Sequence, residues 1–176
     1  MKIGIDFGMT NSTISYYDDT KKESSEALII FRTDAGSNEY IPTVITYNKN
    51  GSVSIGKTAK ASLTKHSVDA YENFKLLLGT NSNEYIEGKN KTPIDVTHDF
   101  IGKLLELFIS KQRKGTAIEC IVMTVPEIWA GEKSNRITAE NIEAIFKKLG
   151  HHDIQLISEP LAATAYFCHA YKHDKK

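Results

Sequence analysis

Cysteine, proline and tryptophan are scarce in this chain of 176 residues, which has two, four and one of them respectively. Two cysteines, each inside an apolar run, cannot form a disulfide framework, so we expect a reducing compartment and a cytoplasmic location. No apolar run approaches the ~20 residues that a membrane-spanning helix needs. The first residues turn polar too soon for a secretory signal peptide, and we therefore expect an intracellular protein.

An excess of charge of either sign is also absent. The chain has 22 basic and 22 acidic residues, a formal net charge of zero. It therefore lacks the excess of basic residues that is typical of proteins that bind nucleic acid or an anionic membrane. We expect no nucleic-acid partner and no membrane partner. Hydrophobic residues make up 40% of the chain and charged residues 25%, which is typical of a globular protein with a packed core.

The hydrophobic pattern changes its period along the chain. The first third alternates with a period of two, which is typical of strands, and later segments repeat at helical spacing. We expect strands at 3–7, 12–17, 27–31, 43–47, 53–55, 117–125 and 154–157, and helices at 71–79, 97–113, 142–149 and 161–171. This order predicts an α/β fold. The last helix is apolar on most sides, and we expect both Cys168 on this helix and Cys120 on a buried strand to be packing residues.

A carboxylate stands at the end of the first expected strand. Asp6 lies on the strand face opposite Ile3, Ile5 and Phe7, between two glycines, and the chain turns directly after it. Glycine at such a turn lets phosphate oxygens approach backbone N–H groups, and the side chains of Thr10, Asn11 and Ser12 add further donors. Asp6 would then hold Mg²⁺ through water. A plain hairpin with a surface aspartate is an equally good interpretation of this segment alone.

A second segment has the form of a nucleotide-binding P-loop. Residues 51–58 read GSVSIGKT and satisfy the pattern G-x-x-x-x-G-K-[ST]. However, Val53 and Ile55 alternate with serines between the two glycines, as in a strand, and Asn50-Gly51 is a strong hairpin signal. A β-hairpin is therefore the preferred interpretation, and a P-loop nucleotide-binding protein is the alternative.

Four segments together resemble one known family. Residues 4–12, GIDFGMTNS, resemble the first phosphate motif of the actin-like ATPases, and specifically of the seventy-kilodalton heat-shock chaperones. Three further segments follow in the order that the family has. FKLLLG (74–79) is similar to the family's lysine-containing helix, and MTVPEIW (123–129) is similar to its strand-proline-aromatic segment. ISEPLAATAY (157–166) is similar to its Glu-Pro helix start. The first motif alone also fits a sugar kinase or an actin relative.

The resemblance implies an actin-like, ribonuclease-H-like ATPase lobe: a mixed sheet with flanking helices and a smaller inserted α+β subdomain. Residues 1–35 and 98–176 would form the core lobe and residues 36–97 the insertion. The family's second phosphate motif would begin near Lys176, and the chain contains no such segment. We therefore expect the second lobe and the peptide-binding domain to be absent, and these residues alone to bind ATP weakly or undetectably.

The resemblance also implies roles for single residues. Lys75, Glu159 and Asp6 would be catalytic, with Asp6 holding Mg²⁺ through water, and ATP or ADP would be the nucleotide. Gly8, Met9, Thr10 and Asn11 would line its phosphates, while Pro126 and Arg136 would relay the nucleotide state to a peptide-binding domain. The implied partners of the complete protein are unfolded peptides, a J-domain co-chaperone and a nucleotide exchange factor, in a stress response.

One departure from the family pattern concerns the phosphate motif. The family usually has Thr where this chain has Met9, and Met cannot donate a hydrogen bond. We expect hydrolysis, or its coupling to conformational change, to be altered as a result. A nucleotide-independent interaction protein built from half an ATPase is a further alternative.

Overall fold

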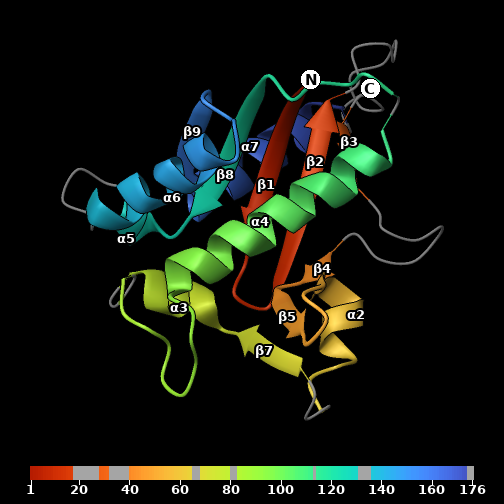
Figure 1. Cartoon of the computed structure of the whole chain (residues 1–176). Coiled ribbons are helices and arrows are strands. Elements are labelled where there is room, and N and C mark those ends of the chain that lie inside the picture. Colours follow the sequence, from red (N-terminus) through yellow and green to blue (C-terminus); the bar gives the residue numbers. More distant parts are fainter. Residues whose placement is uncertain are drawn as a thin grey trace.

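A computed structural model of the chain describes residues 1–17, 28–31, 40–64, 68–79, 83–112, 114–130 and 136–173. These residues form two β-sheets with flanking helices, as the α/β prediction requires (Figure 1). Residue 27 of the third expected strand lies outside the described residues.

The larger sheet is mixed, with β3, β2, β1, β8 and β9 in that order and β4 paired to β2. Its strands are β1 (Lys2–Phe7), β2 (Asn11–Tyr17), β3 (Leu28–Ile30), β4 (Ile41–Pro42), β8 (Cys120–Val125) and β9 (Ile154–Ser158). β1 and β2 form an antiparallel hairpin, whereas β8 runs parallel to β1 and β9 runs parallel to β8. The carboxyl ends of β1, β8 and β9 consequently lie at one edge of the sheet.

The smaller sheet lies between β4 and the long central helix in the sequence. It has three antiparallel strands in the order β6-β5-β7: β5 (Val44–Asn48), β6 (Val53–Ile55) and β7 (Val68–Glu72). Helix α2 (Gly56–Lys60) follows β6, and helix α3 (Phe74–Leu78) follows β7 directly. Figure 1 shows these elements gathered below the larger sheet.

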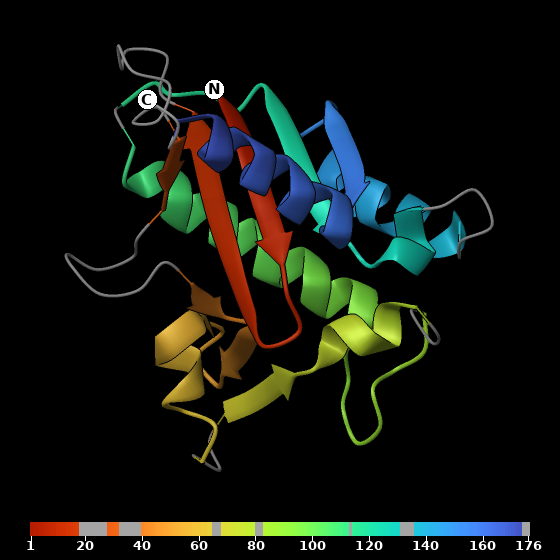
Figure 2. The same cartoon turned by 180° about the vertical axis from the view of Figure 1, so that it is seen from behind.

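Helices cover both faces of the larger sheet. α4 (Pro93–Ser110) crosses one face, and α6 (Arg136–Lys148) packs beside it, after the short α5 (Glu127–Ala130). α7 (Glu159–His173) crosses the opposite face, as the view from behind shows (Figure 2). None of the helices in the described part of the chain is long and apolar enough to cross a lipid bilayer.

The core lies between the larger sheet and α4. Ile3, Ile5 and Phe7 of β1 all point into it and are almost fully buried. The Phe7 ring lies 6.0 Å from the Phe100 ring of α4 and 6.1 Å from the Phe74 ring of α3. This cluster therefore joins the larger sheet, α4 and α3 into one packed unit.

All four expected helices have other boundaries in the structure: α6 begins at Arg136 instead of 142, and α7 runs from Glu159 to His173 instead of 161–171. The expected helix at 71–79 begins only at Phe74, because Tyr71 belongs to β7, a strand that the sequence analysis missed. The expected helix at 97–113 begins earlier and ends earlier, at Pro93 and Ser110. Its start is fixed by a capping box between Thr92 and Asp95, a signal that the apolar spacing alone does not contain.

The expectation that Cys168 of α7 is a packing residue is also wrong. Leu161, Phe167 and Tyr171 on this helix are exposed, and so is Cys168, whereas Cys120 on β8 is buried as expected. The physical reason is that one side of α7 rests on the larger sheet and no described element covers its outer side.

Candidate functional site

A cavity of about 1020 Å³ opens at the carboxyl ends of β1 and β8, beside α3, α5 and the first turns of α7. Six of the residues predicted for the site line it: Asp6, Gly8, Met9, Lys75, Pro126 and Glu159. They come from four separate segments of the chain. The structure thus brings the residues of the first phosphate motif together with Lys75, which lies far away in the sequence.

Lys75 is buried at one side of this cleft, with a side-chain exposure of 4%. Its Nζ donates hydrogen bonds to the backbone carbonyl of Phe7 and to Oε1 of Glu159, the latter at 2.8 Å. The ammonium also lies 5.5 Å from the Phe7 ring centre and 5.9 Å from that of Trp129. These contacts compensate for the lost hydration of the charge and hold the ammonium at the cleft.

The two carboxylates of the site differ from Lys75 in being accessible to water. Asp6 is exposed at the end of β1, and its Oδ1 accepts a hydrogen bond of 2.8 Å from Thr124 on the neighbouring strand β8. Glu159 begins α7, and its side chain is 43% exposed. Mg²⁺ keeps several water ligands and is usually bound through one or two carboxylates together with substrate phosphates. Asp6 therefore fits the role of a water-mediated magnesium anchor.

The loop between β1 and β2 is closely packed where it passes the cleft. A Cβ atom added at Gly8 would lie 2.2 Å from the Asn11 carbonyl oxygen, so only glycine fits here. Met9 lines the cleft and is 44% exposed. Thr10 on the same loop and Asn11 at the start of β2 are exposed but are not among the described lining residues, and their phosphate contacts stay predictions.

Ser12 differs from its expected role as a phosphate donor. It is fully buried, and its Oγ lies 2.9 Å from the Oγ1 of Thr43, a residue between β4 and β5. The sequence analysis missed Thr43 and also Thr124 and Trp129 as residues of this region. No local pattern predicts the first two, because each meets the loop or Asp6 through pairing between distant strands.

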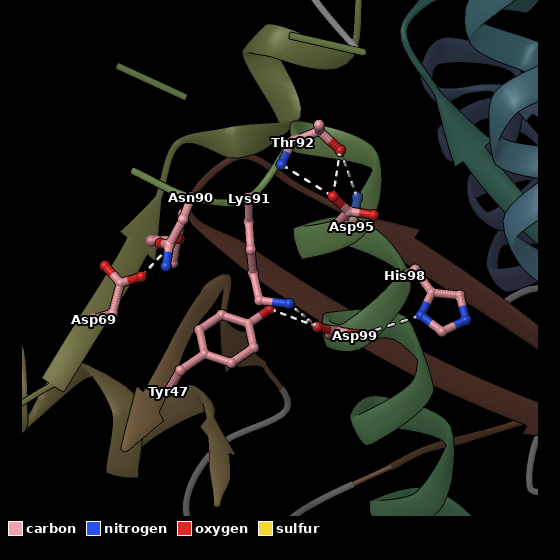
Figure 3. Close-up of polar contacts among 9 residues, drawn as sticks. Tyr47, Asp69, Asn90, Lys91, Thr92, Asp95, His98 and Asp99 are labelled. Carbon is pink, nitrogen blue, oxygen red and sulfur yellow. Dashed lines mark hydrogen bonds and ion pairs between the residues drawn. The ribbon is translucent and has the colours of Figure 1, made fainter. Parts of the chain in front are cut away.

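A polar network fixes the smaller sheet to the start of α4 (Figure 3). The hydroxyl of Tyr47 on β5 and the Nζ of Lys91 donate to Oδ2 of Asp99, at 2.8 and 3.0 Å, and the imidazole of His98 lies 3.1 Å from Oδ1. The Lys91 ammonium also lies 4.4 Å from the centre of the Tyr47 ring. Since β7 of this sheet leads directly into α3, the network contributes to the placement of Lys75.

The network shifts the pKa values of its members. Partial burial alone would raise the pKa of Asp99, but hydrogen bonds from His98, Tyr47 and Lys91 outweigh burial and hold it below the ordinary value of 3.8. Burial and the hydrogen bond to Asp99 raise the pKa of Tyr47 above its ordinary range. Asp99 is therefore an anion and Tyr47 a neutral donor at neutral pH, which is the arrangement their hydrogen bond requires.

The two remaining predicted residues lie near α5 and α6. Pro126 lines the cleft, and its carbonyl accepts a hydrogen bond from the backbone N–H of Trp129. Arg136 is the first residue of α6, and its side chain is outside what the structure describes.

The P-loop alternative does not fit the fold. Val53–Ile55, between the two glycines of that pattern, form strand β6 and pair with β5. Gly51 lies in the hairpin turn with a φ of 81°, and its N–H donates to the carbonyl of Asn48. A phosphate loop would need these residues free of strand pairing, so the hairpin prediction is confirmed.

The fold and the cleft define an α/β protein whose candidate site lies where parallel strands end, and comparison with known proteins identifies the family. The family model described as Hsp70 protein matches residues 2–125. The chaperone protein DnaK of Thermosipho africanus is 28% identical over 174 residues, which are 99% of this chain and 26% of that protein. The chaperone protein DnaK of Mycoplasmopsis pulmonis is 28% identical over 94% of this chain and 25% of its own length.

The chain belongs to the Hsp70 family. This result confirms the resemblance to the seventy-kilodalton heat-shock chaperones and favours it over the sugar kinase. The chain spans about a quarter of the length of the curated relatives that it matches.

Proposed function

We propose that the cleft holds the phosphates of Mg²⁺-bound ATP or ADP, and that the chain forms the first lobe of the ATPase domain of an Hsp70-type chaperone. One observation carries this proposal. The carboxylate of Asp6 and the ammonium of Lys75, from distant parts of the sequence, line the same cavity as the Gly8–Met9 loop. An anchor for a hydrated cation and a fixed positive charge beside bare backbone are what a nucleotide triphosphate requires.

Each side chain has a separate part in this proposal. The ammonium of Lys75 offsets negative charge on the transferring phosphoryl group, and the loss of one such stabilising group costs ~10²–10³ in rate. Its contacts with Phe7 and Glu159 hold it in place before nucleotide enters. The accessible carboxylate of Glu159 orients the attacking water. Asp6 holds hydrated Mg²⁺, which neutralises phosphate charge when it is bound.

The finer division of the fold is part of the same proposal. We assign residues 1–35 and 98–176 to the core lobe and residues 36–97, with the smaller sheet and Lys75, to an inserted subdomain. Two features depart from these bounds, because β4 pairs with β2 of the larger sheet and α4 begins at Pro93. The separate three-stranded sheet supports this division. The uncovered apolar side chains of α7 support a second lobe packing beside the cleft, as the greater length of the relatives allows. Phosphoryl transfer needs both walls of such a cleft, so one lobe binds nucleotide weakly.

The partners of the complete protein follow from family membership. We extend to it unfolded peptide clients, a J-domain co-chaperone, a nucleotide exchange factor, and a role in the cytoplasmic stress response. Pro126 lines the cleft at the point where β8 leads into α5. This position supports a role, together with Arg136, in passing the nucleotide state to a peptide-binding domain.

Nuclear magnetic resonance tests the proposal on these 176 residues. We expect Mg-ATP at millimolar concentration to shift the backbone amide signals of residues 8–11 and the indole signal of Trp129, and the shifts of the loop to shrink when Mg²⁺ is left out. Signals that stay in place at the loop while others move would overturn the proposed site. Saturation at micromolar ATP would contradict the requirement for a second lobe.

A further inference from the structure

Two consecutive backbone carbonyls at the end of β1 are each held by a side chain from outside the β1–β2 hairpin. The carbonyl of Phe7 accepts from Nζ of Lys75, and the carbonyl of Gly8 accepts from Oγ1 of Thr43 at 2.8 Å. Lys75 follows the last strand of the smaller sheet, and Thr43 directly precedes the first. Both ends of the segment that makes the smaller sheet are thus bonded to the start of the proposed phosphate loop.

The contact of Thr43 is part of a buried relay of hydroxyl groups. Thr43 has one hydroxyl proton, which it donates to the Gly8 carbonyl, so the contact of 2.9 Å with Ser12 must use the Ser12 proton. The relay therefore runs from the Ser12 hydroxyl to the Thr43 hydroxyl to the Gly8 carbonyl. Both hydroxyl residues are almost fully buried, where such bonds strengthen one another and water does not replace them.

The relay determines how the loop presents its N–H groups. The peptide bond is planar and trans, so the direction of the Gly8 carbonyl also fixes the direction of the Met9 N–H. The backbone N–H of Thr43 in addition donates to the carbonyl of Thr10 at 2.8 Å. Thr43 thus holds two peptide groups, Gly8–Met9 and Thr10–Asn11. These two peptide groups flank the proposed phosphate contacts.

We infer that Thr43 is a positioning residue, which sets the orientation of the Gly8–Met9 peptide group and couples it to the smaller sheet. Thr43 stands between β4, which pairs with Asn11 and Ser12 in the larger sheet, and β5 of the smaller one. A rotation of the smaller sheet moves Thr43 and therefore turns the peptide group that faces the nucleotide. The consequence for nucleotide binding rests on the proposed function, whereas the effect on the loop does not.

The test uses the complete 176-residue chain and substitutions that differ by one hydroxyl group. Thr43→Val removes the donor to Gly8 but keeps the shape and suits an extended segment. Thr43→Ser keeps the hydroxyl. Thr97→Val is the matched control, because Thr97 is equally buried in α4 and its Oγ1 is the one buried side-chain polar atom without a partner among the described residues.

Amide spectra without nucleotide give the first readout. We expect the Met9 and Thr10 amide signals to shift or broaden in Thr43→Val and to keep their positions in Thr43→Ser and Thr97→Val. Loop signals unchanged in Thr43→Val would overturn the inference. Should Thr43→Val fail to fold, Ser12→Ala interrupts the same relay one step earlier and must shift the same two signals.

A titration with Mg-ATP gives the second readout. We expect Thr43→Val to lower the affinity about tenfold, since a lost hydrogen bond at the phosphate loop has an effect of this order, with Thr43→Ser close to the unsubstituted chain. An affinity equal in Thr43→Val and the unsubstituted chain would contradict positioning for the nucleotide. A loop that loosens in Thr43→Val, in a chain whose residue 8–11 amide signals stay in place while Mg-ATP moves others, would instead refute the proposed site and leave the role of Thr43 in the loop intact.

Discussion

The two faces of the larger sheet differ in what they bury. On the α4 face, Ile3, Ile5 and Phe7 of β1 pack into a continuous apolar core with Phe100. On the α7 face, the same strand presents Gly4 and Asp6, and a cavity remains between the sheet and the helix. The alternation of side chains along one strand thus separates a face that stabilises the fold from a face that is free to bind a ligand.

The two helices also differ, because the apolar side of α4 is buried in the core while α7 keeps apolar side chains exposed. Contacts with α4, α6 and the smaller sheet fill the first face. Small residues such as Gly4, Ala162 and Ala163 leave room on the second face, where a close-packed core would leave none. Substitutions on the two faces should therefore affect different properties of the protein.

The largest expected effect is on the α4 face. Phe100→Ala should lower the free energy of unfolding by about 3–5 kcal/mol, because the ring is fully buried and its removal leaves a cavity. Urea denaturation measures this change. Leu161→Ala on α7 is the control, and as that side chain is 58% exposed we expect a change within about 0.5 kcal/mol. Similar losses of unfolding free energy in both variants would contradict the proposed difference between the two faces of the sheet.

The polar edge of α4 should contribute less. Asp99→Asn should lower the free energy of unfolding by about 1–3 kcal/mol at neutral pH, because it weakens hydrogen bonds to Lys91, His98 and Tyr47. Since folding lowers the pKa of Asp99, the unfolded chain binds the proton more readily, and this stabilisation is present above pH 3.8 and lost as the pH falls through the folded value.

Denaturation curves of Asp99→Asn and the unsubstituted chain at a series of pH values check this account. Their difference in unfolding free energy should be constant near neutral pH and shrink below about pH 4, the range in which an aspartate gains its proton. A difference that grows on acidification would contradict the sign of the pKa shift.

A gain in stability is expected at Thr97, inside the same packed face. Its hydroxyl is fully buried and has no hydrogen-bond partner in the described part of the chain, so Thr97→Val should raise the free energy of unfolding by about 1 kcal/mol. Thermal unfolding followed by circular dichroism measures the gain. A loss of stability would mean that the hydroxyl is bonded in solution.

The smallest effect on stability is expected on the cleft face. Met9→Thr should change the free energy of unfolding by less than about 0.5 kcal/mol, because the side chain is partly exposed. The new hydroxyl should raise the affinity for Mg-ATP about fivefold, the effect of one added hydrogen bond. Calorimetric titration measures the affinity. An affinity that does not rise would show that Met9 does not face the phosphates, and in the complete protein an unchanged turnover rate would show the same.

Much of this arrangement can be predicted from the sequence. The period-two pattern of residues 3–7 gave β1 and its two faces, and the motifs around Asp6, Lys75, Pro126 and Glu159 gave the residues that line the cleft. Strand β7 was missed because the helix-like spacing from Tyr71 onward masked its short extended pattern.

Contacts between distant segments could not be predicted from the sequence. Thr43 reaches Gly8 only because β4 pairs with β2, and Thr124 reaches Asp6 only because β8 is in register with β1. A hydroxyl residue in a strand carries no local signal of such a contact. The exposure of α7 was unpredictable for the same reason, since what covers a helix is decided by elements remote from it in the sequence.

The central claim is that Lys75, and not the lysine of the P-loop-like segment, holds the nucleotide phosphates. Trp129 is the only tryptophan of the chain, and its ring lies 5.9 Å from Nζ of Lys75, so its fluorescence should report Mg-ATP in the cleft. We expect Lys75→Met to abolish this response and Lys57→Met to leave it unchanged. A response that survives Lys75→Met but disappears in Lys57→Met would contradict the account.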